Sequence, residues 1–348
     1  MQSPNHILVI RFSAMGDVAM TVPVIKNVLQ QNPGIQITVV SNAFLQPLFQ
    51  NIERCNFYPA HLKGNHKGIK GIWRLVKELK DLYKFDAIAD LHNVLRSSLI
   101  NFFFTLSNVK TTTLDKGRQQ KKELTRKNNK VLEPLTSMHE RYAEVFRALG
   151  LSIKINNDKP VFGKQTFPAI LQDEFSTEKR IIGVAPFAQH EEKMYPLSKM
   201  KKVVQQLATQ NSTVLLFGGG KNETEILQHW ADDIEGVYNM AGKFLFKDEL
   251  AIISNIQIMV SMDSANMHLA SLFGVKVISI WGATHPYAGF NGWGQKFENI
   301  VQVNLYCRPC SVFGNKPCYR GDNACMNMIS EEMIISKIFE SPVLSSTI

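Results

Sequence analysis

Short apolar runs alternate with longer amphipathic segments along the whole chain. The strand-like runs of the first half are residues 7–11, 35–40, 87–91 and 109–114, and those of the second half are residues 181–185, 213–217, 256–260 and 275–280. Helical patterns lie between them at residues 18–30, 69–83, 97–106, 136–149, 199–210, 223–231 and 248–253. This alternation is typical of parallel α/β units.

Residues 152–179 lack a clear period and contain Pro160, Gly163 and Pro168, so they are expected to connect two domains. We therefore predict an N-terminal domain over residues 1–160 and a C-terminal domain over residues 161–348. Each is expected to be a Rossmann-like, doubly wound sheet. The two would face a central cleft that holds the site at the carboxyl ends of both sheets.

Composition fits a soluble globular protein, with 348 residues, 45% hydrophobic and 20% charged. Arg11 and Asp17 interrupt the N-terminal apolar run, and no apolar stretch approaches the ~18 residues of a membrane span. We therefore expect a cytoplasmic protein. The net charge of +9 indicates an anionic partner, and composition does not choose among nucleic acid, a membrane surface and a phosphorylated substrate.

Residues 261–271 are the most informative segment of the chain. They follow an apolar strand and open a short helix around His268, which Gly274 closes. The free N–H groups and the positive dipole end of such a helix suit a phosphate. The alternative is that Asp263 and Ser264 only cap the helix.

Four segments resemble motifs of one family. Residues 262–274 resemble the N-D-S-G-x-x-H-x-A-x-x-x-G nucleotide-sugar motif of the heptosyltransferase family (glycosyltransferase family 9, GT-B). Residues 11–18 resemble its R-x-S-x-x-G-D-x signature, residues 90–97 its D-x-x-x-x-x-R-S and residues 281–286 its F-G-x-T-x-P. The four occur in the family's order.

The resemblance implies an enzyme, an inverting glycosyltransferase that moves heptose from ADP-heptose to a lipopolysaccharide core-type acceptor. The chain has Asp-Ser-Ala-Asn-Met-His where the family more usually has Asp-Ser-Gly-Pro-x-His. This difference leaves open which sugar and which nucleotide base the donor carries. One alternative is a transferase of another nucleotide-activated sugar to a different surface glycan. The other is a non-catalytic nucleotide-sugar-binding protein.

The resemblance implies that Asp17 is the catalytic base, since an acceptor hydroxyl must lose its proton as it attacks. From its position alone, Asp17 could equally be an acid that favours a helix start. Gly16 beside it lets the backbone approach the donor sugar. We place Arg11, Ser13 and Arg96 of the same signatures in the acceptor site.

The chain contains no Asp-x-Asp motif, so we expect protein groups rather than a metal to stabilise the leaving diphosphate, with no cofactor required for catalysis. Residues 193–196 resemble the family's K-x-W-P, with Lys193 directed to the diphosphate and Tyr195 in place of Trp. The alternative for Lys193 is an ordinary solvated lysine. The remaining donor-binding residues predicted in this segment are Asp263, Ser264, Ala265, Met267 and His268.

A glycine turn follows the predicted strand at residues 213–217. Because G-x-G-x-x-G is absent, hydride chemistry is disfavoured. We predict that Gly219 and Glu223 contact the donor, with Glu223 on the ribose as the resemblance implies. Glu225 is the alternative ribose ligand, and Glu223 could also be only a helix-start acid.

Residues 116–130 carry seven Lys or Arg against the single acid Glu123. This run could be a solvated loop, or Lys121 and Lys122 could bind an anionic, lipid-linked glycan acceptor, with peripheral contact at the cytoplasmic face of the inner membrane. Nucleic acid is disfavoured because no aromatic residues interleave the run.

Four of the five cysteines form a C-x2-C-x7-C-x6-C pattern, namely Cys307, Cys310, Cys318 and Cys325. They could ligate a structural zinc ion. The alternative is a loop of reduced, packed thiols.

Overall fold

A computed structural model describes residues 4–171, 175 and 179–339. The chain divides into two compact units, an N-terminal unit of residues 1–119 and 136–161 and a C-terminal unit of residues 120–135 and 162–348. Within the predicted connection at 152–179, residues 172–174 and 176–178 lie outside the described residues. Among the helices of the described part, none is long and apolar enough to cross a membrane.

Five parallel strands form the N-terminal sheet, in the order β3-β2-β1-β4-β5. Their bounds are β1 (His6–Ile10), β2 (Gln36–Asn42), β3 (Cys55–Ala60), β4 (Ala87–Asp90) and β5 (Lys110–Thr113). Ile7 of β1 pairs with Ile37 on one side and with Ala87 on the other. The strand order therefore reverses between β1 and β4, and ligands of such sheets bind beyond the carboxyl ends at this reversal.

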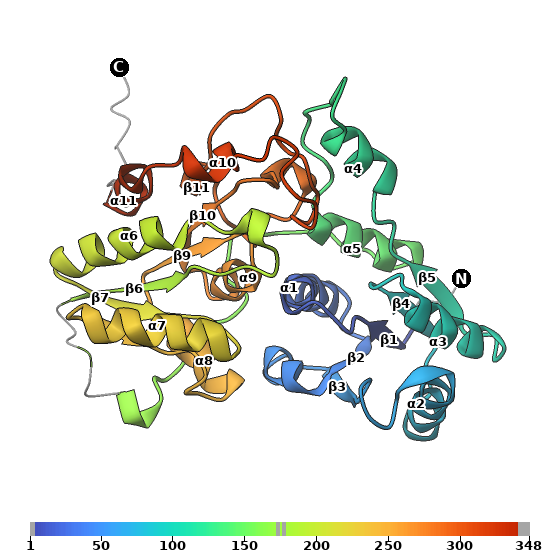
Figure 1. Ribbon diagram of the computed structural model, residues 1–348. Coiled ribbons are helices and arrows are strands. Elements are labelled where there is room, and N and C mark those ends of the chain that lie inside the picture. The colour runs from blue at the N-terminus through green and yellow to red at the C-terminus, as the bar shows by residue number, and fades with distance from the viewer. Residues whose placement is uncertain (1–3, 172–174, 176–178, 340–348) are drawn as a thin grey trace, which may run out of the picture. The chain divides into compact units, whose positions relative to one another are not determined.

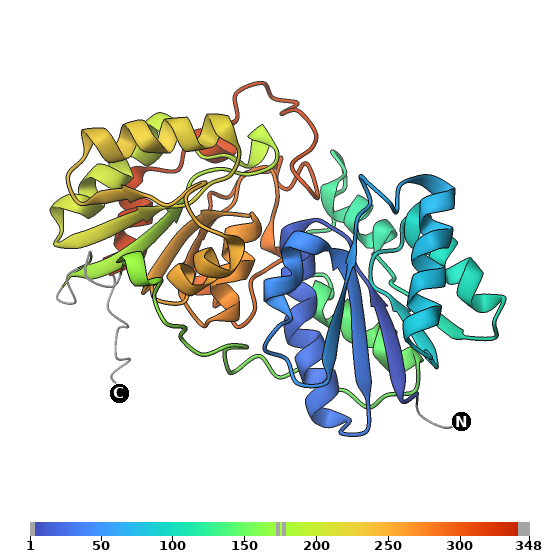
Figure 2. The same cartoon turned by 90° about the horizontal axis from the view of Figure 1, so that it is seen from below.

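Helices cover both faces of this sheet (Figure 2). Helix α1 (Met15–Gln31) packs with α5 (Met138–Ala148), and α2 (Gly68–Leu82) packs with α3 (Leu95–Thr105). Leu8 and Ile10 share a buried cluster with side chains of α2 and α3. Because successive strand residues point to opposite faces, Ile7 and Val9 are buried on the other face. A short 3-10 helix (Ala43–Leu48) connects β2 to β3.

Six parallel strands form the C-terminal sheet, in the order β11-β10-β9-β6-β7-β8 (Figure 1). Their bounds are β6 (Arg180–Ala185), β7 (Ser212–Leu216), β8 (Val237–Asn239), β9 (Ile258–Met262), β10 (Lys276–Ile280) and β11 (Ile300–Val301). This order reverses between β6 and β9. The predicted fold class is thus confirmed as α/β with two Rossmann-like parallel sheets, although the sequence pattern missed β3, β8 and β11.

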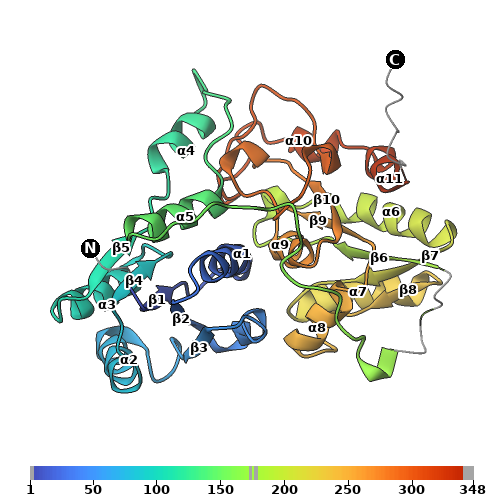
Figure 3. The same cartoon turned by 180° about the vertical axis from the view of Figure 1, so that it is seen from behind.

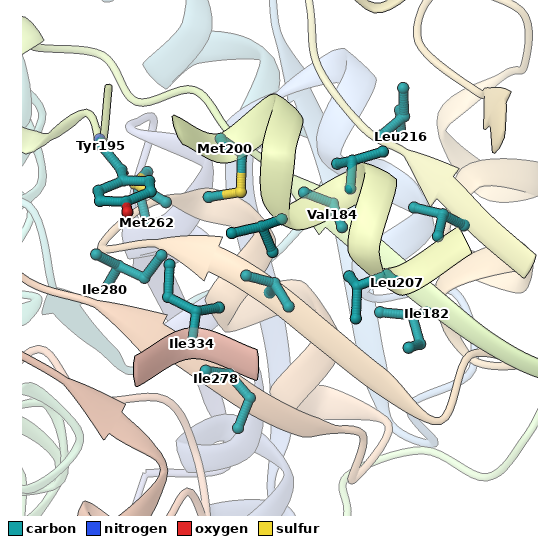
Figure 4. Packing of buried hydrophobic residues seen from close by; sticks show 14 of the residues in the cluster. Ile182, Val184, Tyr195, Met200, Leu207, Leu216, Met262, Ile278, Ile280 and Ile334 are labelled. Carbon is teal, nitrogen blue, oxygen red and sulfur yellow. The ribbon is translucent and has the colours of Figure 1, made fainter. Parts of the chain in front are cut away.

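The C-terminal unit buries its core between strands and helices (Figure 4). Its helices are α6 (Leu197–Thr209), α7 (Lys221–Asp233), α8 (Phe246–Ile253), α9 (Ala265–Leu272), α10 (Ala324–Asn327) and α11 (Glu331–Phe339), with 3-10 turns η2 (Ala169–Leu171), η3 (Glu191–Lys193), η4 (Pro286–Ala288) and η5 (Phe297–Asn299). Helices α6 and α11 lie side by side (Figures 1 and 3). Their apolar faces cover alternate residues of β6, such as Ile182 and Val184.

Residues 120–135 pack on the C-terminal unit although they precede α5 in the sequence. The Leu135 N–H donates to the Tyr287 carbonyl at 2.9 Å. Helix α4 (Arg118–Thr125) leads into this segment, and its Lys121 is only 6% exposed. The Lys121 ammonium lies 4.4 Å from the centre of the Phe290 ring. This gives Lys121 a packing role, whereas Lys122 is exposed.

Candidate active site

In the N-terminal unit, Asp17 lies in the first turn of α1, just beyond the carboxyl end of β1. Its Oδ2 is 2.5 Å from Nη2 of Arg11 and accepts a hydrogen bond from the Ala14 N–H at 3.3 Å. Arg11 is buried, and its Nη1 donates to the Leu91 carbonyl at 2.7 Å. The carboxylate is therefore held in one place while 28% of the Asp17 side chain stays exposed.

His92 interacts electrostatically with Asp17 and with several cationic side chains. Burial, followed by the positive charges of Arg11 and Lys116, lowers the pKa of His92 to about 3, with Arg96 adding to the effect. His92 is therefore neutral near pH 7, and its Nδ1 accepts from the Phe12 N–H at 3.4 Å. Because a neutral imidazole with Nδ1 as acceptor carries its hydrogen on Nε2, His92 can donate from that atom. The sequence did not identify His92 or Lys116 as site residues.

The acid of the second motif has a structural role. Asp90 is buried at the end of β4, and its Oδ1 accepts from the N–H groups of His92 and Asn93, both at 2.9 Å. Its Oδ2 accepts from the Asn101 side chain at 2.8 Å. Asp90 therefore shapes the loop that carries His92. Arg96 and Ser13 are both exposed to solvent.

In the C-terminal unit, two predicted site residues form an ion pair. Lys193 ends η3, after β6, and Asp263 follows β9, the neighbouring strand. Lys193 Nζ lies 2.9 Å from Asp263 Oδ2, and the two side chains are only 14% and 8% exposed. Lys193 is thus no ordinary solvated lysine. A cation is fixed at the carboxyl end of the sheet, where an anionic ligand would bind.

Ser264 occupies the N-cap position of α9, but its hydroxyl does not cap the helix. It lies 3.0 Å from Ser261 Oγ instead. The first-turn amides, beginning with Ala265, are therefore not taken up by that side chain. Met267 and His268 are buried in this helix, so Met267 can reach a ligand only through its backbone.

The two candidate ribose ligands, Glu223 and Glu225, lie in different surroundings near the glycine turn after β7. Glu223 lies in the first turn of α7, and its Oε2 accepts from the Gly219 N–H at 2.7 Å. Glu225 points into solvent with a side chain that is 58% exposed, 3.8 Å from the Lys221 ammonium. The carboxylate held at the turn is that of Glu223.

Tyr195, which stands where the family has Trp, is a core residue here. It is fully buried beside Met262 (Figure 4), and its hydroxyl donates to the Ile329 carbonyl at 3.0 Å. The side chain therefore supports the turn that carries Lys193 and does not face a ligand.

The cysteines of the C-terminal pattern are all free thiols. Burial raises the pKa of Cys325 to about 11, and the pKa of Cys310 is raised by burial and then by Cys318 and Cys307. Several of these thiols thus affect one another's ionisation. Within residues 4–171, 175 and 179–339, however, no three His, Cys, Asp or Glu side chains are grouped so that they could hold a metal ion. As arranged, the thiols do not fit zinc, and the zinc site stays a prediction.

Comparison with known proteins identifies the family. The family model for glycosyltransferase family 9 (heptosyltransferase) matches residues 72–317. The chain is 22% identical over 319 residues to the lipopolysaccharide core heptosyltransferase OpsX of Haemophilus influenzae, covering 87% of this chain and 85% of that protein.

Two solved structures share the fold. One is a family 9 glycosyl transferase of Veillonella parvula, with a TM-score of 0.73, 18% identity and 96% of both chains covered. The other is E. coli ADP-heptose lps heptosyltransferase II, with a TM-score of 0.67, 18% identity and coverage of 96% of this chain and 97% of that one. The resemblance seen in the motifs is thus confirmed, and so is the GT-B fold. The chain is a glycosyltransferase enzyme and belongs to glycosyltransferase family 9, the heptosyltransferase family.

Proposed function

We propose that this enzyme transfers heptose from ADP-heptose to a lipopolysaccharide core-type acceptor, with inversion and without a metal ion. The observation that carries the proposal is the buried Lys193–Asp263 pair, which stands directly before the N-terminus of α9. A fixed cation and a helix N-terminus together suit a diphosphate. The names of OpsX and of the E. coli enzyme support the substrate class.

In the proposed reaction, the N-terminal unit binds the acceptor and Asp17 acts as the base. The Asp17 carboxylate takes the proton of the acceptor hydroxyl while that oxygen bonds to the anomeric carbon. The bond from this carbon to the diphosphate oxygen breaks in the same step, so the configuration inverts. Arg11, Lys116 and Arg96 supply positive charge for acidic groups of the acceptor.

The C-terminal unit binds the donor in this proposal. Lys193 and the first-turn amides of α9, starting at Ala265, stabilise the charge that develops on the departing nucleoside diphosphate. Glu223, already directed at the glycine turn, accepts hydrogen bonds from the ribose hydroxyls. Protein groups thus carry the charge that an Asp-x-Asp metal site carries in other glycosyltransferases.

We further propose that the protein acts at the cytoplasmic face of the inner membrane and touches it through α2 and α3. The exposed residues of α2 and of the C-terminal end of α3 include both apolar and cationic side chains, namely Ile69, Trp73, Phe102 and Leu106 with Lys70, Arg74 and Lys77. Apolar side chains flanked by Lys and Arg suit the interface of an anionic bilayer. A lipid-linked acceptor would be met at that surface.

Vesicle sedimentation tests the membrane contact. Vesicles containing phosphatidylglycerol are expected to retain the protein, and vesicles of phosphatidylcholine alone are not. Trp73→Ala should weaken this binding severalfold, whereas Ile170→Ala, which removes an exposed apolar side chain of η2 away from α2 and α3, should not. Equal binding of both variants, or none by the wild type, contradicts the contact.

A nucleotide-sugar screen tests the transferase function. Thermal stabilisation is measured with ADP-heptose, ADP-glucose, UDP-glucose and GDP-mannose, and turnover is then followed on a heptose-deficient core acceptor by mass spectrometry. We expect stabilisation and product with ADP-heptose. Product with another donor would establish the different-sugar alternative, and stabilisation without product would establish a non-catalytic binding protein.

A further inference from the structure

We propose that the cysteine-rich loop of residues 307–315 holds Lys193 in its productive position, with Gly314 as the positioning residue. The inference rests on the proposed role of Lys193 at the diphosphate. It gives a function to a loop that neither the motifs nor the donor site accounts for.

Gly314 lies directly on the alkyl chain of Lys193. A Cβ atom built on Gly314 would lie 2.3 Å from Cγ and 2.6 Å from Cδ of Lys193, far inside contact distance. Gly314 is buried and has a φ of +73°, a backbone conformation that favours glycine. The loop backbone therefore occupies the space in which the lysine stem could otherwise change rotamer.

The loop is tied to the sheet at its base. Arg308 is buried, and its guanidinium donates to carbonyls of the segment after β10, those of Trp281 at 3.1 Å, Gly282 at 2.5 Å and Thr284 at 3.0 Å. The N–H groups of Cys310 and Ser311 both donate to the Ala283 carbonyl. The base of the loop is thus fixed relative to β10.

Ser311 links the fixed base of the loop to Gly314. Its Oγ accepts from the Gly314 N–H at 2.9 Å and donates to the Asn315 side chain at 3.1 Å. A continuous set of contacts therefore runs from the sheet through Arg308 and Ser311 to Gly314 and the stem of Lys193. The ammonium at the end of that stem lies 2.9 Å from Asp263.

A side chain at position 314 would force the lysine stem to another rotamer or lift the loop. Either change moves the ammonium away from Asp263 and from a diphosphate bound beside it. Gly314 need not touch the substrate, so its role is positioning and its effect must pass through Lys193.

Gly314→Ala tests the inference, with Gly321→Ala as its matched control. Gly321 lies beyond this loop, between Cys318 and Cys325, with a φ of +78°, and a Cβ there meets nothing within 4 Å. Any change that Gly321→Ala causes in ADP binding would therefore come from backbone strain alone. By calorimetry, Gly314→Ala should weaken ADP binding about tenfold, the loss expected when a charged hydrogen bond is misplaced, and Gly321→Ala should change it less than about twofold.

A double-mutant cycle separates positioning from general damage. Lys193→Ala removes the two atoms with which the new Cβ would clash, Cγ and Cδ, so adding Gly314→Ala in that background should weaken ADP binding no further than Gly321→Ala does. Ser311→Ala removes the hydrogen-bond acceptor of the Gly314 N–H without adding an atom, and it should weaken ADP binding by about twofold to fivefold. Ser311→Ala can therefore test the inference even if Gly314→Ala lowers the yield of folded protein.

The outcomes are distinct. Equal losses from Gly314→Ala with and without Lys193 overturn the inference, because the effect would not pass through the lysine. If Lys193→Ala weakens ADP binding but neither Gly314→Ala nor Ser311→Ala does, the inference about the loop is overturned, while the proposed role of Lys193 stands. Unchanged ADP affinity in Lys193→Ala contradicts the proposed role of the lysine, and the role of the loop with it.

Discussion

Substitutions in the Lys193–Asp263 pair should affect protein stability and ligand binding to different extents, so the two effects can be measured separately. Lys193→Ala leaves the Asp263 carboxylate, only 8% exposed, without its cation. Breaking a buried pair in this way costs about 3–5 kcal/mol, and partial access of solvent to Lys193 favours the lower end, about 3 kcal/mol. Since 1 kcal/mol corresponds to about 2–4 °C in a unit of this size, Tm should fall by roughly 6–12 °C.

A variant that removes both charges provides the comparison. In Lys193→Met combined with Asp263→Asn, neither partner is left as an unpaired buried charge, so stability should return to within about 1 kcal/mol of wild type. Binding of ADP should stay weak in both variants, because neither retains a cation for the diphosphate. Differential scanning calorimetry and titration calorimetry with ADP measure the two quantities on the same samples.

Two results would refute this reasoning. A Tm for Lys193→Ala equal to that of wild type would show that the carboxylate gains nothing from the lysine. Wild-type ADP affinity in the double variant would show that the charge of Lys193 is not used at the diphosphate.

The remaining predictions concern metals and the ribose. Turnover should persist in excess chelator, and a requirement for added Mg²⁺ or Mn²⁺ would contradict the metal-free reaction. If Cys307, Cys310, Cys318 and Cys325 hold zinc, purified protein should contain about one equivalent and lose stability when it is stripped; metal-free protein of full stability would favour packed thiols. Glu223→Gln should weaken ADP binding about tenfold while Glu225→Gln leaves it unchanged, and the reverse order would exchange the ribose ligand.

Much of the fold follows from hydrophobic periodicity, and the exceptions have physical reasons. The central strands β1, β4, β6 and β9 are continuous apolar runs because helices cover both faces of each sheet. Strands β3, β8 and β11 are sheet edges. With two residues in β11 and three in β8, pairing with a neighbouring strand defines these elements, and no periodicity can develop over such lengths.

The candidate site was partly predictable. Motif positions indicated Asp17, Lys193 and Asp263, but not the ion pairs that hold them. Lys193 and Asp263 meet because β6 and β9 are neighbours in the sheet, a pairing that a single sequence does not reveal.

The burial of Lys121 is a feature that the sequence did not predict. Lys121 stands in a strongly basic run, which favours solvent or an anionic ligand, yet its ammonium packs on the Phe290 ring. That aromatic partner lies far along the chain, so charge patterning could not predict the burial of Lys121.

Replacement of Asp17 tests the central claim most directly. Asp17→Asn preserves size and removes the base, so kcat with ADP-heptose and core acceptor should fall by roughly 10²-fold or more. The affinity for ADP, measured by calorimetry on the same protein, should stay near that of wild type because Asp17 belongs to the N-terminal unit and the proposed diphosphate site to the other. Turnover by Asp17→Asn close to the wild-type rate would contradict the account and return Asp17 to the role of a helix-start acid paired with Arg11.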